Sequence, residues 1–228
     1  MNKILFIGAH PDDAELGCGG TIDKLREEGY NVRVIMLAEG TSCRYNKCDL
    51  ESEKVKKQIK IRTECAISSL NNLGVNSYKF YDLPCGRLDR EPLIDINKII
   101  EKEINEFKPD SVYTHSNTDT NKDHRIIFEA TRIATRPSSK TFVKNVYLYE
   151  VLSSTEWNFN ESFRPNLFIG LSESNIQKKI NSVNMYITEV HSWPYPRSSE
   201  GIMTLAKYRG MQIGTLYSEA FKIFRSYR

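Results

Sequence analysis

Short apolar runs alternate with longer segments of helical periodicity along the first two thirds of the chain. Residues 4–9, ILFIGA, form a continuous apolar run, which is typical of a parallel strand covered on both faces. Three similar runs follow, and the predicted strands are residues 4–9, 31–38, 77–83 and 111–115. The segments between and after them place apolar residues every three or four positions, which predicts helices. These helices are residues 15–29, 55–74, 92–110 and 123–136.

The order of these elements predicts an α/β fold. Strands that alternate with helices favour a doubly wound, mostly parallel sheet with right-handed crossovers. The last third is mixed: residues 172–184 are predicted to form a helix, and the type of the segments 145–151, 166–171 and 202–214 stays open. With 228 residues, 39% of them hydrophobic, and no linker that marks a boundary, we expect one domain over residues 1–228.

Charge and composition exclude several function classes. The net charge of +3 is a near balance, so nucleic acid or an acidic membrane is not expected as a partner. No run approaches the ~20 apolar residues of a transmembrane segment, and the first residues lack the pattern of a signal peptide. We therefore expect a cytoplasmic protein whose five cysteines, including the CxxxxC pair Cys43 and Cys48, are reduced thiols.

The polar residues directly after the first strand carry the candidate chemistry. They read His10-Pro11-Asp12-Asp13 and lie where open α/β sheets bind their ligands. A dinucleotide-binding turn would read GxGxxG, and carboxylates would repel a pyrophosphate, so nucleotide binding is disfavoured. The side chains of His10 and Asp13 can instead converge on one divalent cation. The structural alternative is that the aspartates cap and stabilise the following helix.

A second polar cluster follows the fourth predicted strand. It supplies His115, Asp119, Asp123 and His124 before the next helix begins. Because the carboxyl ends of parallel strands share one edge, these side chains can face the first cluster. Three of the four histidines of the chain lie at these two strand ends. Two histidines and one carboxylate, with a position left for water, are the composition of a catalytic zinc site, which favours a metal centre over helix capping.

Three segments resemble one enzyme family. AHPDDAELGCGGTI at residues 9–22, DHR at 123–125 and RSSEGIMTLAKYRGMQIGTLYSEAF at 197–221 are similar to motifs of the PIG-L/LmbE-like zinc-dependent N-deacetylases. The resemblance runs from residue 4 to about residue 225 and is diffuse in the middle. It implies a Rossmann-like three-layer sandwich with the active site at the carboxyl ends of the strands.

The resemblance also implies a reaction and its residues. His10, Asp13 and His124 would bind one Zn²⁺ per chain, with Fe²⁺ also compatible, and Asp12 would be the general base for the attacking water. The expected reaction removes an N-acetyl group from a glucosamine-type sugar conjugate. The alternatives are a metal hydrolase of another amide or sugar conjugate, and a non-catalytic sugar- or metal-binding module. Binding alone needs no unligated Asp12, which disfavours the module, and a homo-oligomer is compatible with the sequence.

The second motif departs from the family pattern. Many members read HPDH where this chain reads NKDH at residues 121–124, and the resemblance implies that the missing histidine assists the oxyanion. We expect either that Asn121 donates a hydrogen bond there or that His115 or His191 replaces it. His115 is the better candidate for catalytic assistance by its position at the strand end. Asp123 would orient a metal-bound imidazole or, alternatively, cap the following helix.

Sugar recognition is expected to use Arg62 and Asp89, which match family positions that contact the glucosamine ring. The alternatives are an exposed ion pair on a helix for Arg62 and a plain turn residue for Asp89. Members commonly carry an acidic or amide pair before the RLD motif, whereas this chain has Cys85 and Gly86, so the side of the pocket toward the aglycone differs. Weaker candidates for phosphate contact are Arg44, Arg87 and Arg197.

Overall fold

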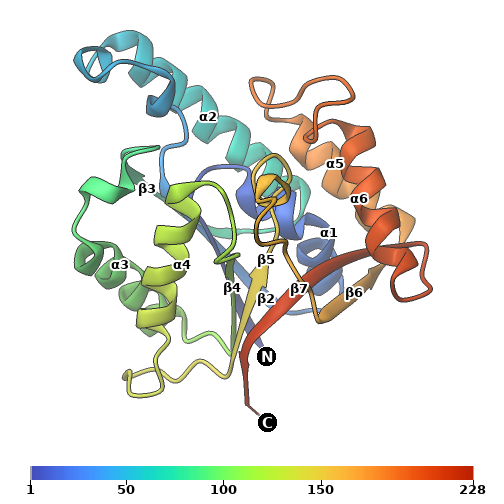
Figure 1. Ribbon diagram of the computed structural model, residues 1–228. Coiled ribbons are helices and arrows are strands. Elements are labelled where there is room, and N and C mark those ends of the chain that lie inside the picture. Colours follow the sequence, from blue (N-terminus) through green and yellow to red (C-terminus); the bar gives the residue numbers. More distant parts are fainter. Residues whose placement is uncertain (1, 228) are drawn as a thin grey trace.

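The computed structural model describes residues 2–227 and contains a seven-stranded sheet between two layers of helices (Figure 1). The strands are β1 (Lys3–Gly8), β2 (Asn31–Ala38), β3 (Ser77–Leu83), β4 (Ser111–His115), β5 (Asn145–Tyr149), β6 (Leu167–Leu171) and β7 (Tyr217–Ser226). Their order in the sheet is β3-β2-β1-β4-β5-β7-β6. β1 to β5 are parallel, and β7 is antiparallel to its neighbours β5 and β6. The predicted mostly parallel α/β fold is confirmed.

Helices cover both faces of the sheet (Figure 1). One layer contains α1 (Asp13–Glu27), α2 (Glu53–Asn72), α5 (Glu173–Asn184) and α6 (Ser199–Met211), and the other contains α3 (Leu93–Phe107) and α4 (Lys122–Ala134). Side chains of β1 alternate between the layers, since Ile4 and Phe6 pack on the α1 side and Leu5 and Ile7 on the α3 side. This double burial explains the continuous apolar run at the start of the chain.

The direction of the chain through the sheet reverses at β1. The chain moves from β1 through β2 to β3 on one side, and it then returns to place β4 and β5 on the other side of β1. The crevice outside the carboxyl ends of β1 and β4 is therefore the topological switch point, where folds of this kind bind ligands. The segments that begin at Ala9 and Ser116 meet there.

The elements predicted from the sequence are found with small shifts, and the segments 145–151, 166–171 and 202–214, whose type was open, contain β5, β6 and most of α6. The polar loop after β2 contains two short 3₁₀ turns, Ser42–Arg44 and Lys47–Asp49, and α6 begins at Ser199. The ten-residue strand β7 was not predicted. Its outer half is largely exposed, and Ser, Glu and Lys interrupt its apolar residues, so its periodicity is weak.

Two expectations about the chain as a whole concern its cysteines and its membrane topology. All five cysteines are free thiols. Within residues 2–227, every helix is too short or too polar to cross a membrane.

Candidate active site

Asp12 stands between β1 and α1 in an unusual backbone conformation. It is the N-cap of α1 with φ of 115°, a region that L side chains rarely adopt and that persists where surrounding contacts fix it. Asp12 Oδ2 forms an ion pair with Arg62 Nη2 at 2.9 Å and accepts a hydrogen bond from Arg197 Nη1 at 2.6 Å. Asp12 Oδ1 is buried and has no hydrogen-bond partner among residues 2–227. One oxygen of this carboxylate is thus fixed and the other is free.

Three side chains from β1–α1 and α4 converge beside Asp12. His10, Asp13 and His124 are buried, and each offers one donor atom within 4.8 Å of the other two. His10 Nδ1 lies 3.3 Å from Asp13 Oδ2, and His124 Nε2 lies 3.4 Å from Asp13 Oδ1. Asp13 Oδ1 and His124 Nε2 have no hydrogen-bond partner among the described residues, which is unusual for buried polar atoms. Two imidazoles, one carboxylate and orphaned donor atoms fit a divalent cation such as Zn²⁺ or Fe²⁺.

A further carboxylate faces the other nitrogen of each imidazole. His10 Nε2 lies 3.0 Å from Asp123 Oδ2, and His124 Nδ1 lies 3.1 Å from Asp119 Oδ2. Asp119 is itself held by the hydroxyl of Thr155, which donates at 2.6 Å. Metal-binding histidines are commonly oriented in this way, because the second hydrogen bond fixes the tautomer and the ring plane. Asp123 thus orients His10, which is far away in the sequence, and Asp119 orients His124, the residue next to Asp123.

The carboxylates determine how the cluster titrates. Burial lowers the pKa of His10, but its hydrogen bonds to Asp123 and Asp13 outweigh burial and raise the pKa to about 10. Burial likewise lowers the pKa of His124, and the charge of Asp13 and the hydrogen bond to Asp119 raise it to about 9. Burial opposes ionisation of Asp13, yet the charge of His124 holds its pKa well below its usual value. A cation that binds both imidazoles therefore displaces a proton from each.

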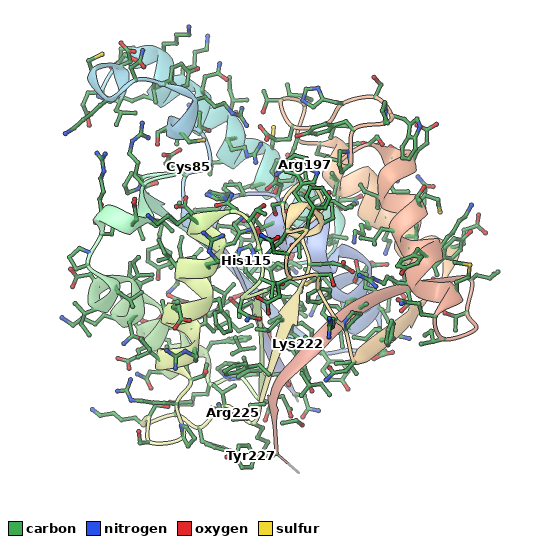
Figure 2. All side chains as sticks on the ribbon, viewed as in Figure 1. Cys85, His115, Arg197, Lys222, Arg225 and Tyr227 are labelled. Carbon is green, nitrogen blue, oxygen red and sulfur yellow. The ribbon has the colours of Figure 1, made fainter. Side chains whose placement is uncertain are left out.

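His115 lies behind the cluster, in the middle of the molecule (Figure 2). Its Nε2 accepts a hydrogen bond from the Ala9 backbone N–H at 2.8 Å, and its ring stacks on His124 with 3.9 Å between the centroids. Burial and the charge of His124 lower the pKa of His115 to about 4, so the ring is neutral at pH 7. His115 thus supports the end of β1 and the ring of His124 through its contacts.

Glu189 forms ion pairs with the arginines around Asp12, and no pattern in the sequence indicates that it belongs to the site. The Glu189 carboxylate forms ion pairs with Arg62, with Arg44 and, at 3.3 Å, with Arg197. Arg62 is only 4% exposed, so it is a buried group of the site and not a surface charge. Glu189 and Arg197 come from the loop between α5 and α6, and Figure 2 shows Arg197 above His115. In the sequence, the one indication that this loop belongs to the site is the position of Arg197 at the start of the family-like motif 197–221.

Comparison with known proteins shows the family. Residues 5–135 match the family model described as PIG-L, GlcNAc-PI de-N-acetylase. The chain belongs to the PIG-L family. The resemblance inferred from the motifs is thereby confirmed.

Individual relatives agree with this assignment. The chain is 26% identical over 187 residues to an uncharacterized deacetylase, YaiS, of Escherichia coli, a match that covers 80% of this chain and 89% of YaiS. N,N'-diacetylchitobiose deacetylase from Pyrococcus horikoshii shares the fold, with a TM-score of 0.76 and 22% identity over 98% of this chain and 84% of that one. So does 4-carboxy-2-hydroxymuconate hydratase from Pseudomonas putida, with a TM-score of 0.77 and 22% identity over 100% and 98% of the two chains. The fold alone therefore does not determine the reaction.

The structure brings some of the expected substrate residues to the site and leaves others at the surface. Arg62 reaches Asp12, whereas Asp89 is exposed and forms an ion pair with Lys122 at 2.8 Å. Asn121 lies next to the cluster, but its side-chain oxygen caps α4 by accepting from the Asp123 N–H at 2.9 Å. His191 is exposed, with its ring edge against Tyr195.

Cys85 extends the set of donor atoms on one side. Its sulfur, a His10 nitrogen and an Asp123 oxygen all lie within 4.8 Å of one another, and the three residues are buried. Figure 2 shows Cys85 on the same upper side of the sheet as His115. A thiol therefore stands beside the metal-type cluster at the position where the family commonly has an acidic or amide residue.

Proposed function

We propose that this PIG-L family protein is a metal-dependent N-deacetylase that hydrolyses the N-acetyl group of a glucosamine-type sugar conjugate. Its metal, one Zn²⁺ or Fe²⁺ per chain, would be held by His10, Asp13 and His124. The observation that supports the proposal is a pair of buried polar atoms at the centre of the site that have no hydrogen-bond partner among residues 2–227. Asp13 Oδ1 and His124 Nε2 lie 3.4 Å apart, and neither these two atoms nor Asp12 Oδ1 has a hydrogen-bond partner within residues 2–227.

The metal and Asp12 would divide the chemistry. A bound Zn²⁺ would lower the pKa of its water toward ~7 and polarise the amide carbonyl. Asp12 Oδ1 accepts the proton of the attacking water and returns it to the amide nitrogen as the C–N bond breaks, which yields acetate and a free amine. Arg62 and Arg197 hold the other carboxylate oxygen, so Oδ1 keeps one direction. Asp123 and Asp119 hold the two imidazoles in the required tautomers.

Residues around this centre would bind the sugar. We assign Asn121 a hydrogen bond from its amide nitrogen to the substrate, because its oxygen is occupied by the helix cap. Asp89 would contact sugar hydroxyls at the rim, where it now pairs with Lys122. His115 would act as a positioning residue that supports His124, since it is buried and bonded to the backbone of Ala9. The glucosamine-type substrate rests on the family description, and hydrolysis of another amide remains the alternative.

The experiment measures metal content and amine release together. Purified protein is analysed for bound metal and assayed for free amine with a panel of N-acetylglucosaminides, and Asp12→Asn is compared with Asp95→Asn, an exposed carboxylate on α3. We expect about one metal per chain in all three proteins and a loss of turnover of roughly 10²–10⁴-fold in Asp12→Asn alone. Absence of metal, or full turnover in Asp12→Asn, would refute the mechanism. Metal without turnover on any sugar of the panel would redirect the search to other amides.

A further inference from the structure

Two cysteines that are far apart in the sequence lie together at the edge of the metal-type cluster. Cys43 belongs to the loop after β2 and Cys85 to the turn after β3, and their side chains are close enough that each shifts the pKa of the other. The Cβ of Cys43 lies directly over Gly86, since a Cβ added to that glycine would be 2.8 Å away from it. Cys48, the partner suggested by the CxxxxC spacing, is instead an exposed residue of the 3₁₀ turn Lys47–Asp49.

Two buried or half-buried charged groups hold the segments of these cysteines in place. The Glu39 carboxylate accepts from the Thr41 N–H at 2.6 Å through one oxygen and from the Cys85 N–H at 2.9 Å through the other. The Arg87 guanidinium donates to the Ser42 carbonyl at 3.1 Å and to the Cys85 carbonyl at 3.2 Å. Four hydrogen bonds therefore hold the loop that carries Cys43 against the turn that carries Cys85.

The surroundings of the two thiols differ in a way that suits stepwise chemistry. Cys43 is exposed and open to small molecules, whereas Cys85 is buried. The neighbouring Cys85 side chain lowers the pKa of Cys43 to about 6, so the exposed thiol is the one that ionises near neutral pH. An accessible thiolate next to a second thiol is the arrangement of nucleophilic and resolving cysteines in redox-sensitive sites.

We propose that Cys43 and Cys85 form an oxidative modification site, at which a small-molecule disulfide such as oxidised glutathione converts them into a reversible intramolecular disulfide. Cys43 Sγ attacks one sulfur of the oxidant, whose S–S bond breaks and releases one thiolate. Cys85 Sγ then attacks Cys43 Sγ, the mixed disulfide breaks, and the second small thiolate leaves with the proton of Cys85. Two protein thiols are oxidised and one small disulfide is reduced to two thiols.

The cross-link would fasten the loop after β2 to the turn that supports the cluster. Gly86 and Leu88 donate their backbone N–H groups to Asp123 at 2.6 and 3.3 Å, and Asp123 orients His10. Arg44, next to Cys43, pairs with Glu189 above the site. The modification is independent of the proposed deacetylation, because it requires neither metal nor sugar.

The test counts thiols and locates the link in the full-length protein. The protein is incubated with oxidised glutathione, alkylated, and analysed by mass spectrometry and by non-reducing peptide mapping. We expect the loss of two of the five thiols, a mass lower by two hydrogen atoms, a Cys43–Cys85 linked peptide, and full recovery with a dithiol reductant. Cys48→Ser is the matched control from the same loop and keeps the link.

The single variants separate the two steps. Cys85→Ser should retain a stable glutathione adduct on Cys43, because its resolving thiol is missing, and Cys43→Ser should form neither adduct nor link at Cys85. Circular dichroism verifies that both variants are folded. A stable adduct on Cys43 of the wild-type protein, or a link between Cys43 and Cys48, would overturn the proposal.

Discussion

His10 and His124 each lie between two carboxylates, so each imidazole holds its proton tightly. Their pKa values of about 10 and about 9 mean that both are protonated at pH 7, whereas a metal needs a free nitrogen on each. We expect metal binding at pH 7 to release about two protons and the affinity to rise roughly hundredfold per pH unit below about pH 9. Calorimetry in buffers of different ionisation enthalpy measures the released protons. Binding whose heat does not depend on the buffer would contradict the ligand assignment.

Among the residues around the three proposed ligands, Asp119 has a clearly defined role: it orients His124. Its contact with His124 Nδ1 holds Nε2 toward Asp13, and Thr155 holds Asp119. Replacing Asp119 with Asn removes the charge that favours this orientation, so we expect roughly 10- to 100-fold weaker metal binding. Asp89→Asn, at a solvent-exposed ion pair, is the control and should bind metal like the wild type. Equal affinity in both variants would argue that His124 is oriented by packing alone.

The convergence of the three proposed ligand residues could be predicted from the sequence, and the partners of their imidazoles could not. His10, Asp13 and His124 follow strands whose carboxyl ends must share one edge, so residue type and position sufficed. The sequence left open which imidazole Asp123 would orient. Adjacent residues of a helix point in different directions, so at the start of α4 Asp123 reaches His10 while His124 turns to Asp13. Glu189 belongs to a distant loop, and no local pattern marks such a contact.

Helix α1, which begins at Asp13, packs closely against β5. α1 contains three glycines, and a Cβ on Gly17 would lie 2.4 Å from the Tyr149 ring and 3.0 Å from the Glu150 carbonyl. Alanine improves helix propensity by about 1 kcal/mol, but overpacking of this kind costs about 1–3 kcal/mol, so the clash outweighs the gain. We expect Gly17→Ala to lower the free energy of unfolding by up to about 2 kcal/mol in urea denaturation.

A second glycine provides the control for this experiment. A Cβ on Gly170 of β6 would meet only Thr215, at 3.6 Å, which is an ordinary contact. Gly170→Ala should therefore leave the urea midpoint nearly unchanged. If Gly17→Ala were equally neutral, the approach of α1 to β5 would be looser than the structure has it.

Prediction of the elements succeeded where periodicity was strong. β1 is apolar on both faces and α3 has a distinct apolar side, and both were located from the sequence. β7 was missed because its position is set by neighbours: it lies between β5 and β6 and is antiparallel to both. Pairing of this kind depends on residues far away in the chain, which a local pattern does not contain.

At the scale of the whole molecule, the candidate site includes residues that lie outside the part of the chain matched by the family model. The family model covers residues 5–135 and thus the three proposed ligands and Asp12, while Arg197 and Glu189 come from beyond it. The later part of the chain therefore completes the surroundings of Asp12. The contacts that hold this later part of the chain to the parallel strands therefore position residues of the site as well as stabilise the fold.

Glu219 of β7 makes that attachment through buried contacts. Its carboxylate accepts from the Gly20 and Thr21 N–H groups of α1, at 3.0 and 2.7 Å, and from Lys179 Nζ of α5 at 2.6 Å. Lys179 and Glu219 are each about 95% buried in their side chains, since the exposed fractions are 5% and 5%. Removing one partner of a buried pair leaves an uncompensated charge and costs about 3–5 kcal/mol. We expect Glu219→Gln to destabilise the protein by that amount.

The double variant Lys179→Met with Glu219→Gln distinguishes charge from packing. With the cation also removed, no buried charge remains unpaired, so we expect most of the lost stability to return. Urea denaturation of the wild type, both single variants and the double variant gives the coupling free energy between the two residues. Additive losses would show that the pair is not coupled, and that β7 is held to α1 and α5 by apolar contacts instead. Metal affinity should stay at the wild-type value in every folded variant, because neither residue contacts the cluster of His10, Asp13 and His124.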